Sequence, residues 1–355
     1  MSARTLFLHV GSSKTGTSTL QASLWRSTDA LADAGIGVPY PGREAHVKRV
    51  VGPLGWAPSR GYDPDADPSG AMARLTRRLR KTPGDRLVMS NEDLADAPPS
   101  AIKAFGEAVV AADLDLHVIV TARDWTRQLP SEWQQFLKER LTQPYPEFLD
   151  AVRRREGHFA ERFWLRQDLL GISRRWGAGL DPSRVHLIPV PPASVDADLV
   201  FRSFGEVVGC DPAVLDRSGA GDINQSYGFV EAEVLRRLNA QLGDRLADYA
   251  GEYRRAVRGT LARKVLARKA SARIPLPPEQ LGWVREVAEG HVAGLRADGY
   301  AVHGDLETLV PGPEDCAPLP PVGDAEIAEA AIETLINFSI RRLREIDAAG
   351  KGGTA

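Results

Sequence analysis

The sequence is poor in cysteine and in long apolar runs, and each shortage excludes a class of protein. Only two cysteines occur in 355 residues, Cys210 and Cys316, and they are too few and too far apart for a disulfide framework. No apolar run reaches the roughly 18 residues that a membrane span requires. The beginning of the chain, MSARTLFLHV, is also unsuited to a signal peptide. We therefore expect a cytoplasmic protein without a transmembrane segment.

An excess of positive charge is also lacking. The 45 basic and 47 acidic residues leave a net charge of −2, whereas a dedicated nucleic-acid binder carries a strongly basic footprint. Hydrophobic residues make up 43% of the chain and charged residues 26%, which allows a sizeable core and argues against wholesale disorder. The length suits one large domain or two small ones.

Four short apolar runs predict buried parallel strands. Long helical patterns separate these runs, and such alternation predicts an α/β fold whose parallel sheet is flanked by helices. The runs cover residues 5–10, 86–90, 116–122 and 184–190. Ligands of such sheets bind beyond the carboxyl ends of the strands, so the residues that follow each run are the candidates for function.

The pattern along the chain predicts three parts. Residues 1–240 form the α/β core, in which the Gly-, Pro- and Asp-rich stretch 39–70 is expected to be a loop or lid. Residues 241–347 are expected to form a helical C-terminal extension that packs on the core, and residues 348–355 a disordered tail. The stretch 252–274 within the extension carries eight basic residues, and it either closes over a bound anion or forms a solvated face.

The stretch LFLHVGSSKTGTSTLQASL, residues 6–24, has the layout of a phosphate cradle. A strand, a tight turn and a helix that begins near Thr17 bring several backbone N–H groups and the positive end of a helix to one point. Glycines let the backbone approach an anion, the lysine adds a mobile cation, and hydroxyl groups add donors. The ordinary alternative is a strand–turn–helix with Ser/Thr capping. The candidate anion-binding residues are Gly11, Ser13, Lys14, Thr15, Gly16, Thr17 and Ser18.

The cradle differs from the usual nucleoside-triphosphate loop. That loop ends in Gly-Lys-Ser/Thr, but here Lys14 precedes Gly16 and no lysine follows a glycine at the helix start. The loop is also shorter, which favours an anionic group smaller than a triphosphate. A Mg²⁺-dependent kinase would need an acidic residue after a neighbouring strand, and the sequence SNEDLAD after residue 89 keeps that alternative open.

A second candidate site lies in VIVTARDWTRQLPSEWQQFLKER, residues 118–140. Arg123 directly follows a predicted strand, so its guanidinium is expected at the ligand edge, where its planar fork suits a phosphate monoester. Pro130 and Ser131 are expected near the start of a helix, whose N–H groups and hydroxyl would take the same phosphate. The alternative is that Arg123 pairs with Asp124 or another carboxylate and that Ser131 only caps the helix.

Together, in this order, the two motifs resemble those of bacterial sulfotransferases that use 3′-phosphoadenosine 5′-phosphosulfate (PAPS). The resemblance covers residues 4 to about 240. It departs from the best-known cytosolic members at Leu20 and Gln21, where those proteins carry a tryptophan. The resemblance implies a P-loop-like sulfotransferase fold and an enzyme that moves a sulfuryl group from PAPS to a hydroxyl, or less often an amine. The implied acceptor is a glycan, a glycolipid or a small metabolite. The resemblance implies no metal cofactor and no nucleic-acid partner.

The resemblance also implies roles for the candidate residues. Lys14 would face the bridging oxygen of the phosphosulfate, Thr17 and Ser18 would hold the 5′-phosphate, and Arg123 and Ser131 would hold the 3′-phosphate. The general base is left open between two residues. Glu92 follows the second predicted strand and His46 lies in the loop after the first helix, while their ordinary roles would be a helix cap and a solvent histidine.

The sequence leaves two rival functions and the oligomeric state open. One rival is a small-molecule kinase that uses ATP and Mg²⁺. Another is a nucleotide-binding module that has lost its chemistry. Homo-oligomerisation is also undecided. No His/Cys spacing indicates a metal site.

Overall fold

The computed structural model describes residues 4–42, 68–218, 227–266 and 271–351. These residues divide into two compact units that are discontinuous along the chain. The first contains residues 1–128, 160–224 and 281–312, and the second contains 129–159, 225–280 and 313–355. The division thus assigns residues 281–312, which we had expected in the helical extension, to the unit that holds the sheet.

The first unit is built on a six-stranded parallel sheet with the strand order β2-β3-β1-β4-β5-β6, which confirms the predicted fold class. All four predicted strands are present. The sheet also has two short edge strands that apolar runs did not reveal, because each spans only two residues. The strands are β1 (Arg4–Gly11), β2 (Ile36–Gly37), β3 (Arg86–Ser90), β4 (Leu114–Ala122), β5 (Val185–Pro189) and β6 (Ala301–Val302).

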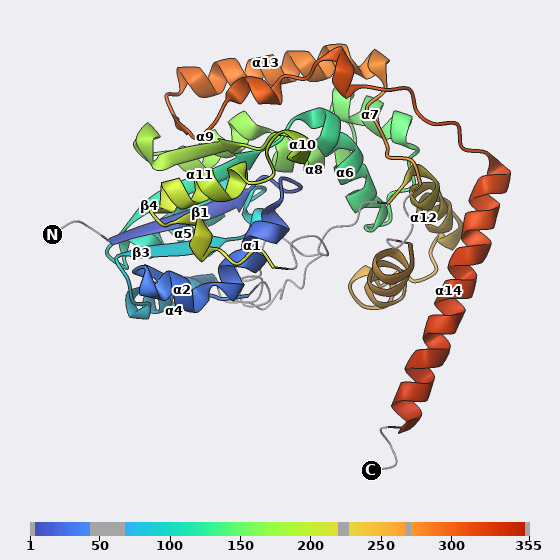
Figure 1. Cartoon of the computed structure of the whole chain (residues 1–355), viewed down its shortest axis with the longest axis horizontal. Helices are drawn as coiled ribbons and strands as arrows, with labels where there is room; N and C mark the ends of the chain where they lie inside the picture. The colour runs from blue at the N-terminus through green and yellow to red at the C-terminus, as the bar shows by residue number, and fades with distance from the viewer. Residues whose placement is uncertain (1–3, 43–67, 219–226, 267–270, 352–355) are drawn as a thin grey trace. The chain divides into compact units, whose positions relative to one another are not determined.

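Helices cover both faces of this sheet (Figure 1). Side chains alternate along β1, so Leu6, Leu8 and Val10 enter one apolar core while Phe7 enters the other. The first core is completed by α4 (Pro68–Lys81), α5 (Pro99–Val110), α9 (Leu169–Gly177) and α13 (Leu281–Ala297). The second is completed by α1 (Thr17–Arg26), α2 (Thr28–Asp33) and α11 (Leu199–Val208), and the short α10 (Ala193–Asp196) precedes α11. Burial on both faces explains why the central strands read as nearly continuous apolar runs.

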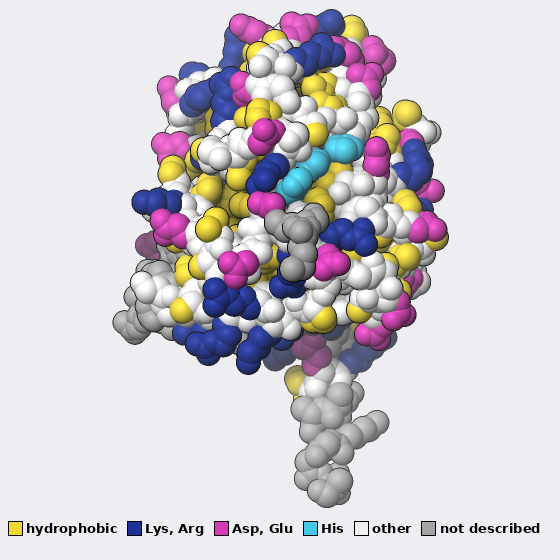
Figure 2. Space-filling model, turned by 90° about the vertical axis from the view of Figure 1, so that its left-hand side faces the viewer, with side chains coloured by type: hydrophobic (Ala, Val, Ile, Leu, Met, Phe, Trp, Pro, Cys, Tyr) yellow, Lys and Arg dark blue, Asp and Glu magenta, His cyan; other side chains and the backbone are white. Residues whose placement is uncertain are grey.

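Three histidines form a hydrogen-bonded row across β4, β5 and the end of β6. His117 Nδ1 lies 2.9 Å from His186 Nε2, and His186 Nδ1 lies 3.1 Å from His303 Nε2. Histidine side chains also appear as a short row on the face shown in Figure 2. Burial, with the neighbouring charges of His117 and His303, lowers the pKa of His186 to about 4. His186 is therefore neutral near pH 7. Among the described residues, no group of three or more His, Cys, Asp or Glu side chains is placed to hold a metal.

The second unit is helical and has an aromatic core. Trp133 packs against Tyr145 and Phe229, with ring centroids 5.2 and 6.2 Å apart. Tyr253 donates a 2.7 Å hydrogen bond to Asn239 Oδ1, and the Asn239 amide donates to the backbone carbonyls of Leu137 and Leu141. Its elements are the C-terminal part of α6 (Trp125–Leu137), α7 (Tyr145–Arg154), α12 (Phe229–Leu242), the π-helical η7 (Tyr249–Val265) and α14 (Asp324–Lys351).

The helical patterns predicted near the C-terminus are present, with shifted bounds. The pattern at 275–298 becomes α13, which begins at Leu281 because the prolines before it cannot donate backbone hydrogen bonds. The pattern at 324–347 becomes α14, which continues through Lys351, so residues 348–351 are helical rather than part of a tail. Most of the expected lid, 39–70, lies outside the described residues. No helix in the described ranges combines the length and the apolar character that a bilayer crossing requires.

Candidate functional site

The candidate site lies where the strand order of the sheet reverses. Strand β1 pairs with β3 on one side and with β4 on the other, so the chain leaves β1 and β4 in opposite directions at their carboxyl ends. Ligands of open α/β sheets bind in the crevice at such a point. The loop 12–16 follows β1 and Arg123 follows β4, so the two predicted motifs meet at this edge. The Ser12 N–H ties them together by donating to the Thr121 carbonyl over 2.8 Å.

The backbone of the β1–α1 loop has the shape expected of an anion cradle. Lys14 and Gly16 have φ angles of 66° and 85°, in the left-handed region, and they turn the chain sharply into α1. Gly16 is the N-cap of α1 and makes no side-chain capping bond, and the first turn of the helix has no acidic residue. The N–H groups of Thr17 and Ser18 stand in the first turn, where the helix ladder offers no acceptor, at the positive end of the helix.

Gly11 is required where the loop leaves the sheet. Its φ is +116°, which side-chain-bearing residues rarely adopt, and a Cβ there would lie 3.3 Å from the Ala95 Cβ and 3.5 Å from the Glu92 Cα. The loop therefore passes directly over the segment that follows β3. This close approach brings the backbone of Glu92 to the beginning of the cradle.

Two of the candidate hydroxyl residues hold the loop in shape. Thr15 Oγ1 donates to the Ser12 carbonyl over 2.8 Å and lies 2.6 Å from Thr121 Oγ1. Ser13 is held by two glutamines that the sequence did not reveal as part of the site. Gln128 Nε2 donates to the Ser13 carbonyl over 2.8 Å, and Gln167 Nε2 donates to Ser13 Oγ over 2.9 Å. Ser13 and Thr15 thus stand in the cradle with their side chains turned to the protein, and their contact with a ligand stays a prediction.

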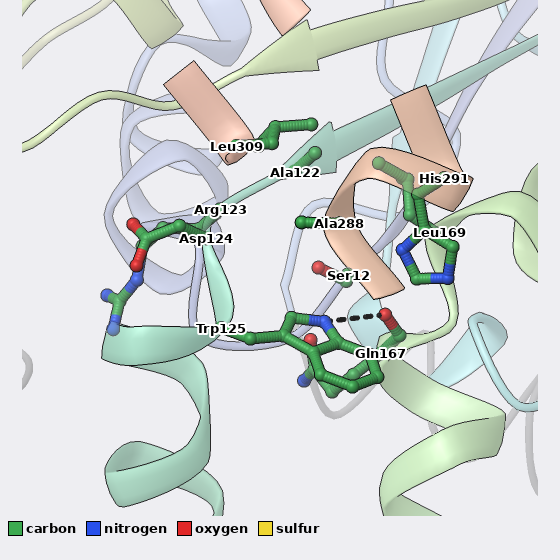
Figure 3. Close-up of a pocket in the computed structure, with 10 residues that line it drawn as sticks. All are labelled: Ser12, Ala122, Arg123, Asp124, Trp125, Gln167, Leu169, Ala288, His291 and Leu309. Atoms are coloured by element: carbon green, nitrogen blue, oxygen red, sulfur yellow. Dashed lines mark hydrogen bonds between the residues drawn. The ribbon is translucent and has the colours of Figure 1, made fainter. Parts of the chain in front are cut away.

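A pocket opens beside the cradle at the end of β4. Figure 3 shows the residues that line it. Its polar and charged lining residues are Ser12, Arg123, Asp124, Gln167 and His291, and the others are Ala122, Trp125, Leu169, Ala288 and Leu309. A concave site with a mostly apolar wall and a few convergent polar groups is typical of small-molecule binding.

Arg123 sits at this pocket, and its neighbour Asp124 caps helix α6. The Arg123 guanidinium donates to the carbonyl of Arg127. Asp124 accepts from the Arg127 N–H over 3.2 Å and forms an ion pair with the Arg127 side chain. This capping fixes the direction in which the chain leaves β4.

The expectation that Ser131 opens a helix is wrong. Helix α6 begins at Trp125, so Ser131 is its seventh residue and Pro130 lies inside the helix. Asp124 provides the N-cap of this helix, whereas we had expected Pro130 and Ser131 near its start. Pro130 in the second turn is tolerated at the cost of one backbone hydrogen bond. Ser131 also falls in the second compact unit, whereas Arg123 falls in the first. Its contact with a 3′-phosphate stays a prediction.

The pocket wall is made rigid by Trp125. Its indole Nε1 donates to the Gln167 carbonyl over 3.2 Å, the bond drawn in Figure 3. Its ring meets Phe163, Trp164 and His291 edge to face, with centroids 4.9 to 5.6 Å apart. Such geometry is favourable for aromatic pairs. Trp125 was within the second motif but its role was not visible from sequence, because its partners come from elements far along the chain.

His291 is oriented by Asp168, the N-cap of α9. Its Nε2 lies 3.1 Å from Asp168 Oδ1. Burial disfavours the charged form of Asp168, but hydrogen bonds from His291 and from the Gly171 N–H, with the charges of His291 and Arg175, outweigh it and lower the pKa of this carboxyl below its usual value. The pair thus places a defined imidazole at the pocket.

Glu92, one of the two candidate bases, is at the same edge of the sheet. It begins the short turn η3 (Glu92–Leu94) after β3, is 7% exposed, and accepts a hydrogen bond from Gln21 Nε2 of α1. Its neighbour Asp93 is buried in an ion pair with Arg166, whose Nη2 lies 3.7 Å from Asp93 Oδ1. Glu92 is therefore the carboxylate of this turn that lies next to the cradle. The other candidate, His46, lies outside the described residues.

Comparisons with known proteins add little to this geometry. No protein family and no curated protein sequence matches the chain. Among solved structures, the crystal structure of a sulfotransferase from Alicyclobacillus acidocaldarius is similar, with a TM-score of 0.42 and 18% sequence identity over 70% of this chain and 99% of that chain.

Proposed function

We propose that the chain is a sulfotransferase that moves a sulfuryl group from PAPS to a hydroxyl or amine of a glycan, glycolipid or small metabolite, releasing 3′,5′-adenosine bisphosphate. The proposal rests on the position of two candidate anion-binding elements at one edge of the sheet. The cradle follows β1 and Arg123 follows β4, the two neighbouring strands at which the strand order reverses. A ligand with two separate phosphate groups needs two such binding elements close together.

The residues of this edge fit such a ligand. The N–H groups of Thr17 and Ser18 at the start of α1 would hold the 5′-phosphate, and Lys14 would face the bridging oxygen as it becomes a phosphate anion. Arg123 would hold the 3′-phosphate, because a guanidinium fork matches the oxygens of a phosphate monoester. Gln128 and Gln167 would act by fixing the loop through Ser13.

The chemistry that follows is an in-line displacement at sulfur. The bond from sulfur to the bridging oxygen breaks, a bond from sulfur to the acceptor oxygen forms, and the acceptor proton passes to a base. Glu92 is our proposed base, since its carboxylate stands beside the cradle and is oriented by Gln21. His46 stays the alternative.

For the kinase alternative, the side chains around β3 leave a single candidate carboxylate in the turn η3. A kinase would need a carboxylate there that is able to bind Mg²⁺. Asp93 is instead engaged by Arg166 inside the protein, and Asn91 uses its side-chain oxygen to cap the turn by accepting from the Asp93 N–H over 2.9 Å. These contacts leave Glu92 as the carboxylate of this turn that adjoins the loop.

The proposal is tested by thermal unfolding with 3′,5′-adenosine bisphosphate and, separately, with ATP and Mg²⁺. A ligand present at a hundred times its dissociation constant adds about 2.7 kcal/mol to the free energy of unfolding. We expect a rise in melting temperature with the bisphosphate that EDTA does not change. Lys14→Ala and Arg123→Ala should reduce it, whereas Lys103→Ala and Arg153→Ala, which remove exposed charges, should not.

The other outcomes are equally informative. Stabilisation by ATP and Mg²⁺ alone would replace the sulfotransferase by the kinase. Binding of the bisphosphate without sulfuryl transfer to any acceptor in a broad screen would favour a binding module that lacks chemistry.

A further inference from the structure

Helix α14 packs against its own unit along one face, and its opposite face is exposed. The covered face carries the buried Ile327 and half-buried side chains at spacings of three and four residues, and the helix packs there against α12 and η7. Arg237 of α12 forms a 2.7 Å ion pair with Asp324 and fixes the start of α14. Figure 1 shows α12 beside the upper part of α14.

The opposite face is a stripe of large aliphatic side chains. Six of them are 45 to 64% exposed, which is unusual for contiguous residues of this size on a protein surface. They recur at spacings of three and four residues, so they lie along one side of the helix. The stripe consists of Ile332, Leu335, Ile336, Ile340, Leu343 and Ile346.

The middle of this stripe is suited to close contact between helices. Ser339 lies halfway between Ile332 and Ile346 on the same side of the helix, and its hydroxyl already donates to the Leu335 carbonyl over 2.9 Å. A small side chain lets two helix backbones approach, and a hydroxyl that is satisfied within its own helix can be buried at little cost.

The charges beside the stripe change sign along α14. Its first ten residues contain Asp324, Glu326, Glu329 and Glu333 and no basic residue. After the centre come Arg341, Arg342, Arg344 and Lys351 against the acids Glu345 and Asp347, and Glu345 pairs with Arg341 and Arg342 within the helix. The helix is therefore complementary to itself when turned end for end. A parallel pair would instead place acidic beside acidic and basic beside basic residues.

We propose that α14 pairs with α14 of a second copy of this chain, antiparallel and centred on Ser339, to form a homodimer. In this arrangement Ile332 of one copy packs near Ile346 of the other, and Glu333 of one copy comes within one residue of the level of Arg344 of the other. An anionic membrane surface fits less well, since interfacial helices carry basic residues along their whole polar flank and this helix is acidic in its first half. The proposal is independent of the enzymatic function.

The first test is the oligomeric state of the full-length protein, measured by sedimentation velocity over a concentration series. We expect a reversible dimer. Leu343→Glu should weaken it at least tenfold, whereas Asn337→Glu adds the same charge to an exposed position outside the stripe and should leave it intact. Both positions are exposed, so the melting temperature of the monomer should change little. A wild-type protein that stays monomeric, or a dimer that Leu343→Glu does not disturb, would overturn the proposal.

The second test determines direction and register. In a Cys210→Ser, Cys316→Ser background, Ser339→Cys should form a disulfide-linked dimer on mild oxidation, but Ile332→Cys and Ile346→Cys should each fail to link alone and should link to one another when mixed. Self-linking of Ile346→Cys would contradict the antiparallel arrangement. Glu333→Arg should weaken the dimer, and adding Arg344→Glu should restore it. A monomer that instead co-sediments with anionic vesicles through the stripe would assign the stripe to a membrane surface.

Discussion

The hydroxyl oxygens of Thr15 and Thr121 lie 2.6 Å apart and join the loop after β1 to strand β4. Thr121 Oγ1 also donates to the Gly11 carbonyl over 3.1 Å and lies 3.1 Å from His9 Nε2. His9 Nδ1 in turn lies 2.7 Å from Ser90 Oγ at the end of β3. A buried polar network therefore connects three neighbouring strands beneath the cradle, and it explains how a loop rich in small residues keeps one shape.

Replacing the centre of this network should be costly. Thr121→Val keeps the volume and the β-branched shape but leaves Thr15, His9 and the Gly11 carbonyl without a shared partner. Loss of a buried hydrogen-bonding group costs about 1–3 kcal/mol. Urea unfolding should show a lower midpoint with the same slope. Thr308→Val, at an exposed position, is the matched control, and equal midpoints for the two variants would show that the network contributes little.

Two buried histidines should make the free energy of unfolding depend on pH. Burial lowers the pKa of His9 to about 4, against the opposing charge of Glu92, and lowers that of His186 to the same value. An unfolded histidine titrates near 6.5, so between about pH 6.5 and 4 the unfolded chain binds more protons than the folded one. The protein should therefore lose stability as the pH falls through this window, by up to about 1.4 kcal/mol per pH unit for each group.

Urea unfolding at a series of pH values measures this slope. His186→Gln should flatten it, whereas His158→Gln, which replaces an exposed histidine, should leave it unchanged. Carboxyl groups with lowered pKa values, such as Asp168, begin to lose their contribution below about pH 5, so the histidine slope is read between pH 6.5 and 5. A wild-type slope of zero between pH 6.5 and 5 would mean that these histidines are protonated in the folded protein.

The central strands and the cradle were predictable from the sequence because each depends on residues that are close together in the chain. An apolar run such as Leu6–Val10 reports burial on both faces directly, and the glycines of the loop report its turns. The short strands β2 and β6 were not predictable, since two residues give no pattern and the sheet itself supplies their hydrogen bonds.

The missed parts of the candidate site depend on contacts between distant residues. Gln167 meets Ser13 across 154 positions, and His291 reaches the pocket from α13, which lies in a stretch that we had assigned to the extension. The start of α6 was misplaced because Pro130-Ser131 is a common helix opening, while Asp124 as an N-cap is equally common and comes earlier. Propensity alone does not choose between the two.

Glu92 should be needed for the chemical step but not for binding. Glu92→Gln preserves the size of the side chain and its contact with Gln21 but removes the group that takes a proton. Loss of a general base lowers the turnover rate by about 10²–10⁴-fold. With PAPS and an active acceptor, turnover should fall in this range while the thermal shift with 3′,5′-adenosine bisphosphate stays unchanged. Glu107→Gln, at an exposed position, is the control.

His46→Gln separates the two candidate bases. If this variant loses turnover and Glu92→Gln keeps it, the base is His46 and Glu92 only supports the loop. If both lose turnover with unchanged binding, the two residues act in the same step.

The ion pairs of Arg166 and of Arg174 should differ sharply in their effect on stability. Arg166 is 4% exposed, and its guanidinium lies 3.7 Å from Asp93 and 3.2 Å from Asp96. Arg166→Met removes the cation of a buried ion pair, which costs about 3–5 kcal/mol. Arg174 makes a geometrically better contact with Asp298, at 2.8 Å, but at the surface, where water screens it, so Arg174→Met should barely move the urea midpoint.

A second substitution tests whether the uncompensated charge is the cause. Asp93→Asn in the Arg166→Met background removes the buried charge and should recover part of the lost stability, although Asp93→Asn alone should destabilise the protein because it leaves Arg166 with one partner fewer. Such a recovery is a coupling free energy between two neighbours and is measured by the double-mutant cycle. If the two losses simply add, the cost of Arg166→Met comes from its packing and not from the charge of Asp93.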